Sequence, residues 1–343
     1  MKALLDVAGL TRVFAVPPKG GGASILGRTP SQLHAVDHVS FAIGEGETVG
    51  LVGESGCGKS TLVRLLNRLI DPTSGGIRFA GGDLAGIPAR RFGQAPERAL
   101  IQMVFQDAQD SLNPRYTAFD AIADPLKRLK RLRGAALKGR VAALAGMCGL
   151  PAELLSRFPH QLSGGQKARV GIARAIAVEP KLLILDEPTA ALDVSVQVVI
   201  LQLLDELKTK LGMSYLFVSH DLNVVRLICD RVLVMYLGKI VESGPTARVF
   251  RSPRHPYTAA LLSAIPSFEP GAGGTRMRLA GEPRSPIDPD PKVCRFYGRC
   301  PKGEAKCHSE MPVLTEIEYG RRVACHFPET DKPAAAPALK VVA

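Results

Sequence analysis

A run of nine residues with three glycines, a lysine and three hydroxyl side chains is the part of the sequence best suited to chemistry. It reads Gly53-Glu54-Ser55-Gly56-Cys57-Gly58-Lys59-Ser60-Thr61 and fits the pattern Gly-x4-Gly-Lys-Ser/Thr. Backbone N–H groups can wrap a phosphate closely only where Cβ atoms are absent, which explains the glycines. Lys59 adds a positive charge for the terminal phosphates, and the Ser60 hydroxyl is placed for Mg²⁺. The run therefore predicts a nucleoside triphosphate site.

Four polar side chains stand at or just after the carboxyl ends of apolar runs that have the character of buried strands. They are Gln106, Asp186, Glu187 and His220. Open α/β sheets bind their ligands at this edge. Asp186 suits Mg²⁺, and Gln106 can bridge the metal and a water molecule. Glu187 suits polarising that water, and His220 can reach the γ-phosphate, so the set predicts hydrolysis of the nucleotide.

A second glycine pair stands at the start of a predicted helix, in the run Leu162-Ser163-Gly164-Gly165-Gln166. Ser163 and Gln166 have the spacing of a capping box, in which the two side chains bond to each other's backbone N–H groups. A helix N-terminus with two glycines is also a phosphate site. One chain does not need two such sites for one nucleotide.

Four of the seven cysteines lie within the last fifty residues, among prolines and glycines: Cys294, Cys300, Cys307 and Cys325. A segment of this composition is not expected to bury a core, so a bound metal would supply its folding energy. Four thiolates suit either tetrahedral Zn²⁺ or a 4Fe–4S cluster. The absence of a closely spaced cysteine pair argues against zinc, although His308 and His326 adjoin cysteines and could substitute as zinc ligands.

The composition is that of a folded protein with anionic partners. The chain has 343 residues, which predicts two domains or one large domain with an appendage. The net charge of +12 favours nucleotides, nucleic acids or anionic membrane surfaces without choosing among them. No apolar run approaches the roughly 20 residues of a membrane span, and the N-terminus does not resemble a signal peptide. We therefore expect a cytoplasmic chain with reduced thiols.

Apolar runs alternate with helical patterns, which predicts an α/β fold with a mostly parallel central sheet. The expected strands are Val39–Ile43, Thr48–Val52, Ile101–Phe105, Leu182–Leu185, Ser214–Val218, Arg231–Tyr236 and Lys239–Glu242. Residues 3–14 predict a short strand and a turn, residues 17–33 an exposed loop, and residues 75–83 a hairpin arm. Helical patterns cover residues 117–160 and 194–211. The basic side chains of the first of these lack interleaved aromatics and indicate a solvated helix face.

In their order along the chain, these motifs resemble those of ABC-type ATP-binding subunits. The order is the phosphate loop 53–61, the Q-loop Gln106, the signature 162–166, the Walker B run 182–186 with Glu187, the D-loop 191–193 with Asp193, and the switch His220. The resemblance covers about residues 1–250. It implies a P-loop NTPase fold with a RecA-like core, an antiparallel β arm and a helical subdomain.

The same resemblance implies a head-to-tail dimer with two ATP molecules at its interface. Each ATP would lie between the phosphate loop of one subunit and the Ser163–Gln166 segment of the other, which accounts for two phosphate sites in one chain. Glu187, His220 and Gln106 would serve catalysis, with Mg²⁺ on Ser60, Gln106 and Asp186. The family also has an aromatic platform for adenine near the N-terminus, for which Phe14 is the candidate.

A narrower resemblance is to the ATPase subunits of dipeptide and oligopeptide importers, and more to the subunit called F than to its D partner. It rests on the strings Phe105-Gln106-Asp107, Ser111–Arg115, His255–Leu262 and Gly281-Glu282-Pro283. Ala108 and Ala190 depart from the usual pattern without removing a catalytic group. This resemblance implies a C-terminal 4Fe–4S cluster on the four late cysteines. It also implies a peripheral position on the cytoplasmic face of the membrane.

The implied partners are a second ATPase subunit (a D-type chain or another copy), two transmembrane permease subunits and, indirectly, a peptide-binding protein. A helix of the permease is expected near Gln106–Arg115, and no nucleic-acid partner is expected. The expected division is a nucleotide-binding domain at 1–265 with a helical subdomain at about 107–178, a connector at 266–293, a cysteine-rich module at 294–330 and a disordered tail at 331–343.

Alternative functions share the same ATPase chemistry. The cargo could be nickel, glutathione or a sugar, because other subunits select it. The chain could also be an accessory ATPase of a phosphonate-cleaving complex. A non-transport ATPase acting on nucleic acid or ribosomes would typically carry two cassettes or long coiled insertions, and this sequence has neither.

Overall fold

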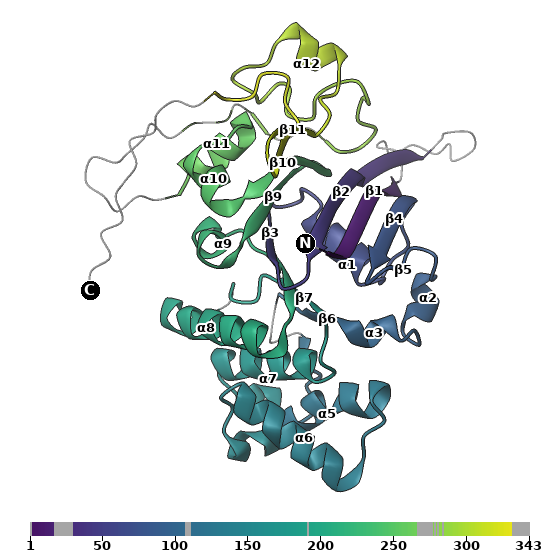
Figure 1. Cartoon of the computed structure of the whole chain (residues 1–343), viewed down its shortest axis with the longest axis vertical. Helices are drawn as coiled ribbons and strands as arrows, with labels where there is room; N and C mark the ends of the chain where they lie inside the picture. The colour runs from purple at the N-terminus through teal and green to yellow at the C-terminus, as the bar shows by residue number, and fades with distance from the viewer. Residues whose placement is uncertain are drawn as a thin grey trace, which may run out of the picture.

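The computed structural model describes residues 2–16, 30–106, 111–190, 192–265, 277, 279, 281–282 and 285–330. Most of the expected loop at 17–33 and all of the expected tail at 331–343 therefore lie outside the described residues. The described chain forms an antiparallel sheet, a larger mixed sheet, and a group of helices at one end (Figure 1). None of the described helices is long and apolar enough to cross a membrane.

The central sheet has the strand order β11-β12-β10-β9-β3-β8-β7-β6. Its parallel part consists of β6 (Ile101–Val104), β7 (Leu182–Asp186), β8 (Ser214–Val218), β3 (Thr48–Val52) and β9 (Arg231–Tyr236). Alternate residues of β7 enter different cores: Leu182 and Ile184 pack on one face of the sheet, and Leu183 and Leu185 on the other. Burial on both faces explains why these strands are continuous apolar runs.

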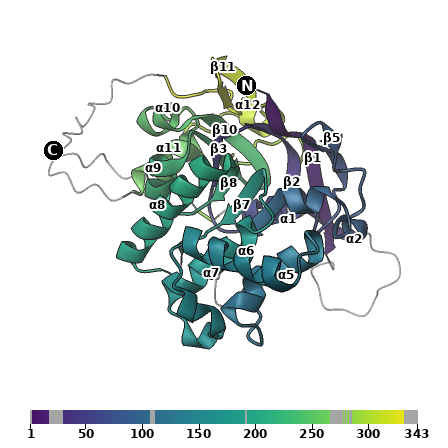
Figure 2. The same ribbon diagram turned by 60° about the horizontal axis from the view of Figure 1, so that its bottom comes forward.

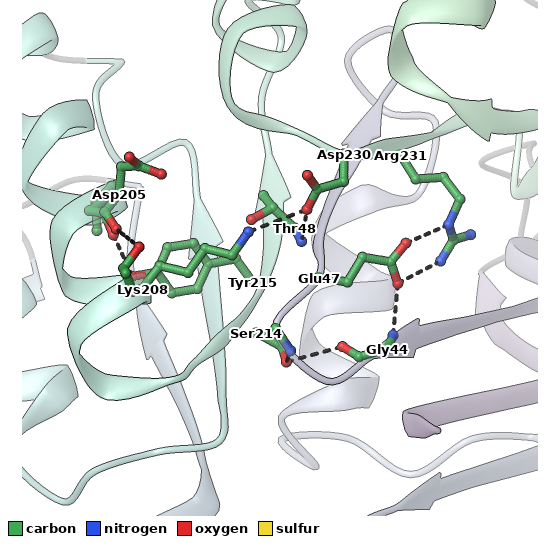
Figure 3. Close-up of polar contacts among 12 residues, drawn as sticks. Gly44, Glu47, Thr48, Asp205, Lys208, Ser214, Tyr215, Asp230 and Arg231 are labelled. Atoms are coloured by element: carbon green, nitrogen blue, oxygen red, sulfur yellow. Dashed lines mark hydrogen bonds and ion pairs between the residues drawn. The ribbon is translucent and has the colours of Figure 1, made fainter. Parts of the chain in front are cut away.

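Strand β3 is anchored at its start by polar contacts from later segments (Figure 3). The Thr48 backbone N–H donates to Asp230 Oδ2 at 2.8 Å, and Lys208 Nζ lies 3.3 Å from the same oxygen. Arg231 Nε donates to Glu47 Oε1 at 2.7 Å. These contacts hold β3 against β9 at one end, so the loop that follows Val52 leaves the sheet from a fixed strand.

The antiparallel sheet has the order β2-β1-β4-β5 and covers one face of the central sheet together with α1 (Lys59–Leu66). Its strands are β1 (Ala3–Val16), β2 (Ser31–Gly44), β4 (Ser74–Phe79) and β5 (Gly82–Asp83). The expected short strand and turn at 3–14 was wrong, because one strand of 14 residues is formed. The register shifts between Val7 and Leu10, where Gly9 has φ 57°, and this bulge interrupts the apolar alternation that marks a strand.

Three helices gather at the end of the molecule opposite β11, as both views show (Figures 1 and 2). They are α5 (Ala118–Leu129), α6 (Gly134–Met147) and α7 (Gly164–Ile176). The N-terminus of α5 is capped by Thr117, whose Oγ1 accepts from the Asp120 N–H at 3.1 Å. Lys127 and Arg128 are exposed, and Arg128 pairs with Asp124 at 2.8 Å, which agrees with the expected solvated helix face.

The remaining helices are mostly short. They are α2 (Ala89–Phe92), α3 (Glu97–Leu100), α8 (Val194–Leu211), α9 (Leu222–Ile228), α10 (Thr246–Arg251), α11 (Pro256–Ser263) and α12 (Ala305–Ser309). Helix α8 has the bounds that its periodicity predicts, and it ends at Gly212, which takes the left-handed conformation (φ 62°). Two turns of 3-10 helix at 152–156 and 159–161 lead into α7.

The C-terminal segment is continuous with the central sheet. Strands β11 (Thr315–Glu318) and β12 (Arg321–Val323) form a hairpin, and β12 pairs with β10 (Lys239–Pro245). Phe296 is 1% exposed and belongs to the main core, and Arg321 Nη2 donates to the buried Glu242 at 2.8 Å. The expectation that this segment buries no core was therefore wrong: it uses the core of the preceding domain.

Candidate nucleotide-binding site

The glycine loop follows β3 and ends where α1 begins at Lys59. Two of its glycines are required by close backbone neighbours. A Cβ atom on Gly53 (φ 155°) would lie 2.2 Å from the carbonyl oxygen of Met235, and one on Gly58 (φ 112°) would lie 2.2 Å from that of Ala35. The loop is thus pressed between β9 and β2, so packing demands glycine at these positions in addition to any need of a phosphate.

Cys57 is the one cysteine of the loop, and it is only 2% exposed. Its carbonyl oxygen accepts from the Gly238 N–H at 2.8 Å, which ties the loop to the turn between β9 and β10. Burial raises the pKa of the Cys57 thiol above its ordinary value. Cys57 therefore packs as a small apolar side chain and does not present a reactive thiolate.

Lys59 is 8% exposed, and its ammonium group is held by the loop itself. Nζ donates to the carbonyl oxygen of Gly53 at 2.7 Å and to that of Glu54 at 3.1 Å. A buried charge needs such partners because its desolvation is costly. The two carbonyl oxygens hold the ammonium group against the loop, where Lys59 borders the cavity described below.

The three predicted catalytic side chains lie together, because Gln106 and His220 both contact the carboxylate of Glu187. Glu187 Oε2 accepts from Gln106 Nε2 at 2.8 Å and lies 3.1 Å from His220 Nδ1. Glu187 has φ 48°, a conformation that L-residues rarely adopt and that is found at functional sites. Asp186, at the end of β7, is almost buried. Burial first, and then the charge of Glu187, raises the pKa of Asp186 despite the opposing charge of Lys59.

Lys59, Gln106, Glu187 and His220 border one open cavity of about 450 Å³, whereas Asp186 is not among the described residues that line it. Its lining is Leu33, His34, Ala35, Ser55, Gly56, Gly58, Lys59, Ser60, Thr61, Gln106, Glu187, His220, Gly238 and Pro286. Residues from β2 and the 237–238 turn were not predicted, because they belong to no motif and reach the cavity only through the fold. Pro286 is held beside β2 by a backbone hydrogen bond: the His34 N–H donates to the carbonyl oxygen of Pro286 at 2.9 Å.

Phe14, the predicted adenine platform, lies on β1 opposite Leu33 of β2. The guanidinium carbon of Arg12 lies 4.5 Å from the centroid of the Phe14 ring. Among the described residues, Leu33 lines the cavity and Phe14 does not.

The second glycine pair begins α7, and Ser163 caps this helix. Ser163 N–H donates to Gln166 Oε1 at 2.9 Å, and Gln166 N–H donates to Ser163 Oγ at 3.3 Å, so the predicted capping box is present. A Cβ atom on Gly165 would lie 2.7 Å from Val196 of α8, which explains that glycine. Within the described part of the chain, residues 163–166 do not line the cavity of the glycine loop. Asp193 occupies the N-cap position of α8 without a capping bond from its side chain, and it is exposed, while Ala191 lies outside the described residues.

A groove of about 380 Å³ lies beside Gln106, between the core and the helical end. Its lining includes Leu69 and Phe105, which are 56% and 43% exposed. It also includes Arg98 and Arg174, and burial lowers the pKa of both guanidinium groups. The groove is open, partly apolar and basic. Residues 107–110, which belong to the expected docking surface, lie outside the described residues.

The four late cysteines border one small cavity, together with His255, Phe296, Tyr297 and His326. The Cys294 N–H donates to the carbonyl oxygen of Cys307 at 2.9 Å. Burial raises the pKa of the Cys300 thiol and raises that of Cys325 to about 11. The backbone N–H groups of residues 302 and 327 donate to these two sulfurs and oppose the shift.

The cysteines are not joined to one another in disulfides. Within the described ranges, no three His, Cys, Asp or Glu side chains are close enough together to hold a metal ion. The structure therefore brings the four thiols to one cavity but does not confirm the expected metal-bound module.

Two family descriptions match the chain. The one described as "ABC transporter" matches residues 36–190, and the one described as "Oligopeptide/dipeptide transporter, C-terminal region" matches residues 241–307. The "Oligopeptide transport ATP-binding protein OppF" of Salmonella typhimurium is 44% identical over 94% of this chain and 96% of its own length. The "Dipeptide transport ATP-binding protein DppF" of Haemophilus influenzae is 42% identical over 94% of this chain and 96% of its own length.

Solved structures show the same fold. A dimeric structure of the ATP-binding cassette MJ0796 in a post-hydrolysis state with ADP and phosphate is 29% identical, with a TM-score of 0.61. The similarity covers 71% of this chain and 98% of that cassette.

Proposed function

Because this chain belongs to the family of ATP-binding subunits of oligopeptide and dipeptide ABC transporters, we propose that its ATP hydrolysis drives the import of short peptides. The observation that carries the proposal is the convergence of Gln106 and His220 on Glu187 at the cavity that holds Lys59. A carboxylate placed there is suited to orienting a water molecule toward the terminal phosphate.

The proposed division of labour follows from the positions of the side chains. The loop amides and Lys59 hold the phosphates, and His220 contacts the γ-phosphate. Ser60, Gln106 and Asp186 offer the oxygen ligands that Mg²⁺ prefers. A bound cation would also offset the burial that raises the pKa of Asp186. When bound, Mg²⁺ would supply positive charge for the phosphates, while the residues of the chain position the water and the nucleotide.

The proposed ATP site is completed by a second subunit, either a D-type chain or another copy. In the described part of the chain, the Ser163–Gln166 segment lies outside the cavity of its own glycine loop; Ser163 is exposed and residues 164–166 are half-buried. Val194 and Val198 on the first turns of α8 are 79% and 49% exposed, next to Asp193. An apolar surface beside a second phosphate site favours a partner that covers both.

We also propose that the groove beside Gln106 receives a helix of a transmembrane permease subunit, which places the chain on the cytoplasmic face of the membrane. The exposed Phe105 and Leu69 offer apolar contacts, and Gln106, the residue after Phe105, donates to Glu187. Occupation of the groove and the geometry of the hydrolysis site would thus affect each other.

We propose further that the four late cysteines hold a 4Fe–4S cluster, with Zn²⁺ as the alternative. The shared cavity and the backbone N–H groups that donate to Cys300 and Cys325 support this, because such bonds stabilise metal-bound thiolates. When bound, the cluster would stabilise the module. Anaerobic purification should give a brown protein with on the order of four iron atoms per chain. A colourless protein that holds one zinc ion would contradict the cluster.

Transport is tested by deleting the gene and restoring it as the wild type or as Glu187→Gln. The wild type should restore uptake of labelled di- and tripeptides, and the variant should not. A matched control is Glu206→Gln, an exposed change on α8. Peptide uptake that is unaffected by the deletion, with loss of nickel or glutathione uptake, would assign a different cargo.

A further inference from the structure

Glu54 of the glycine loop is bound by three different parts of the chain. Its backbone N–H donates to Tyr257 Oη at 2.9 Å, and its carbonyl oxygen accepts from Lys59 Nζ at 3.1 Å. Its carboxylate accepts from Arg299 Nη1 at 3.0 Å, across 245 residues of sequence. Among the described residues, Glu54 does not line the nucleotide cavity, so these bonds hold the loop from behind.

Arg299 belongs to the cysteine-rich module and directly precedes Cys300. Its side chain is only 10% exposed, and Nη1 also donates to Tyr236 Oη at 3.2 Å. The pair is partly withdrawn from solvent, because the Glu54 side chain is 30% exposed and that of Arg299 is 10% exposed. Such a pair is screened less than a fully exposed one, and loss of Glu54 leaves the guanidinium of Arg299 without its carboxylate. Arg299 is therefore more than a surface contact between the module and the loop.

The turn from Cys294 to Cys300 contacts three different parts of the molecule. The Tyr297 N–H donates to the Cys294 carbonyl at 2.9 Å, and the Cys300 N–H donates to the Phe296 carbonyl at 3.0 Å. Both cysteines border the cysteine cavity, Phe296 is buried in the core, and Arg299 reaches the glycine loop.

The core side of this turn is an aromatic cluster that also holds the loop. The ring centroid of Phe296 lies 5.2 Å from that of Tyr236 and 5.6 Å from that of Tyr257. Tyr236 binds Arg299, and Tyr257 accepts from Glu54. Movement of the turn would therefore displace Glu54 by two routes. One is the bond from Arg299 to its carboxylate, and the other is the contact of Phe296 with Tyr257, which binds its backbone N–H.

We propose that Arg299 is a positioning residue for the ATPase, through which the Cys294–Cys300 turn sets the affinity of the glycine loop for ATP. By holding Glu54, Arg299 fixes the carbonyl oxygens from which Lys59 extends to the phosphates. The role is separate from catalysis at Glu187. It requires the turn to keep its shape and does not depend on which metal the cysteines bind.

The direct test compares Arg299→Gln with Arg322→Gln, an exposed change in the same module. Arg299→Gln should raise both the KM for ATP and the Kd for a fluorescent ATP analogue about 3- to 10-fold, with kcat changed less than about twofold. Arg299→Lys, which keeps the charge, should recover part of the affinity. Equal KM values for Arg299→Gln and Arg322→Gln would overturn the proposal.

Coupling between the two partners gives a second, independent measurement. Glu54→Gln alone should weaken ATP binding to the same extent, and adding Arg299→Gln should cause no further loss. Independent, multiplying losses would show that Arg299 does not act through Glu54. If Arg299→Gln folds poorly, the single variant Glu54→Gln still tests the pair, because it changes no residue of the module. An unchanged Kd for the ATP analogue in Glu54→Gln would then overturn the proposal.

The connection to the cysteines is tested with Cys300→Ser. This change should raise the KM for ATP in the chain that retains Arg299 and have little effect in the Arg299→Gln chain. An equal rise in both chains would mean that the turn influences the ATP site by another route.

Discussion

Gln106 Nε2 donates to Glu187 Oε2 at 2.8 Å, although 81 residues separate them. Gln106 follows the edge strand β6 beside the open groove, and Glu187 follows the buried strand β7. The pair therefore joins the surface proposed for the permease to the residue proposed for hydrolysis. A shift of Gln106 would change the position of the Glu187 carboxylate.

Glu187→Gln should abolish hydrolysis and preserve ATP binding. The amide keeps the shape of the side chain and removes the negative charge that orients water, so kcat should fall by about 10²–10⁴-fold. Size-exclusion chromatography with ATP and Mg²⁺ should then show an accumulated dimer, which Glu206→Gln should not. Normal ATPase activity of Glu187→Gln would remove Glu187 from the mechanism.

The parts that sequence predicts well are those in which a local pattern determines structure. The strand–loop–helix around Lys59, the capping box of Ser163 and Gln166, and the bounds of α8 all depend on neighbouring residues. The sequence also predicts that Gln106 and Glu187 lie at one edge of the sheet, because parallel strands bring their carboxyl ends together there. The direct bond between them was not predicted.

The parts that sequence misses depend on contacts between distant segments. Gly9 hides the continuity of β1, because a bulge shifts the apolar alternation. The bond between Arg299 and Glu54 has no local signal, since an arginine between cysteines and a glutamate in a phosphate loop each look solvent-exposed in sequence. The C-terminal segment could not be assigned a core, because Phe296 packs on residues of the preceding domain.

The pair of Glu242 and Arg321 should be essential for docking the C-terminal module. Their exposed fractions are 0% and 2%, and Glu242 also accepts from the backbone N–H of His255 at 2.9 Å. Arg321→Ala leaves a buried carboxylate uncompensated and should lower the free energy of unfolding by about 3–5 kcal/mol. Urea denaturation measures this, with the exposed Arg322→Ala as the control. Equal stability of the two variants would contradict the predicted role.

The buried thiol of Cys148 should make stability fall in alkali. Burial raises its pKa from 9.0 to about 12, so the unfolded chain ionises first as pH rises. Above pH 9.0 the native state then binds more protons than the unfolded state. The unfolding free energy therefore falls between pH 9.0 and about 12, until the native thiol ionises as well. Cys148→Ala should flatten the decline of unfolding free energy with pH over this range. The unfolding free energy of Cys148→Ala at pH 8, where the thiol is protonated in both states, measures the loss of packing alone.

Two inactive variants should restore each other if two chains share each ATP site. Lys59→Ala removes the charge of the glycine loop, and Ser163→Arg blocks the helix start of α7, so each should be inactive alone. A mixed dimer places both defects in one site and leaves the other intact. Mixing the variants should therefore recover up to about half of the wild-type activity of such dimers, because each site is one of two. ATPase activity against mixing ratio measures this. A mixture as inactive as its components would mean that two copies of this chain do not form the working dimer, and that a different ATPase subunit supplies the second half.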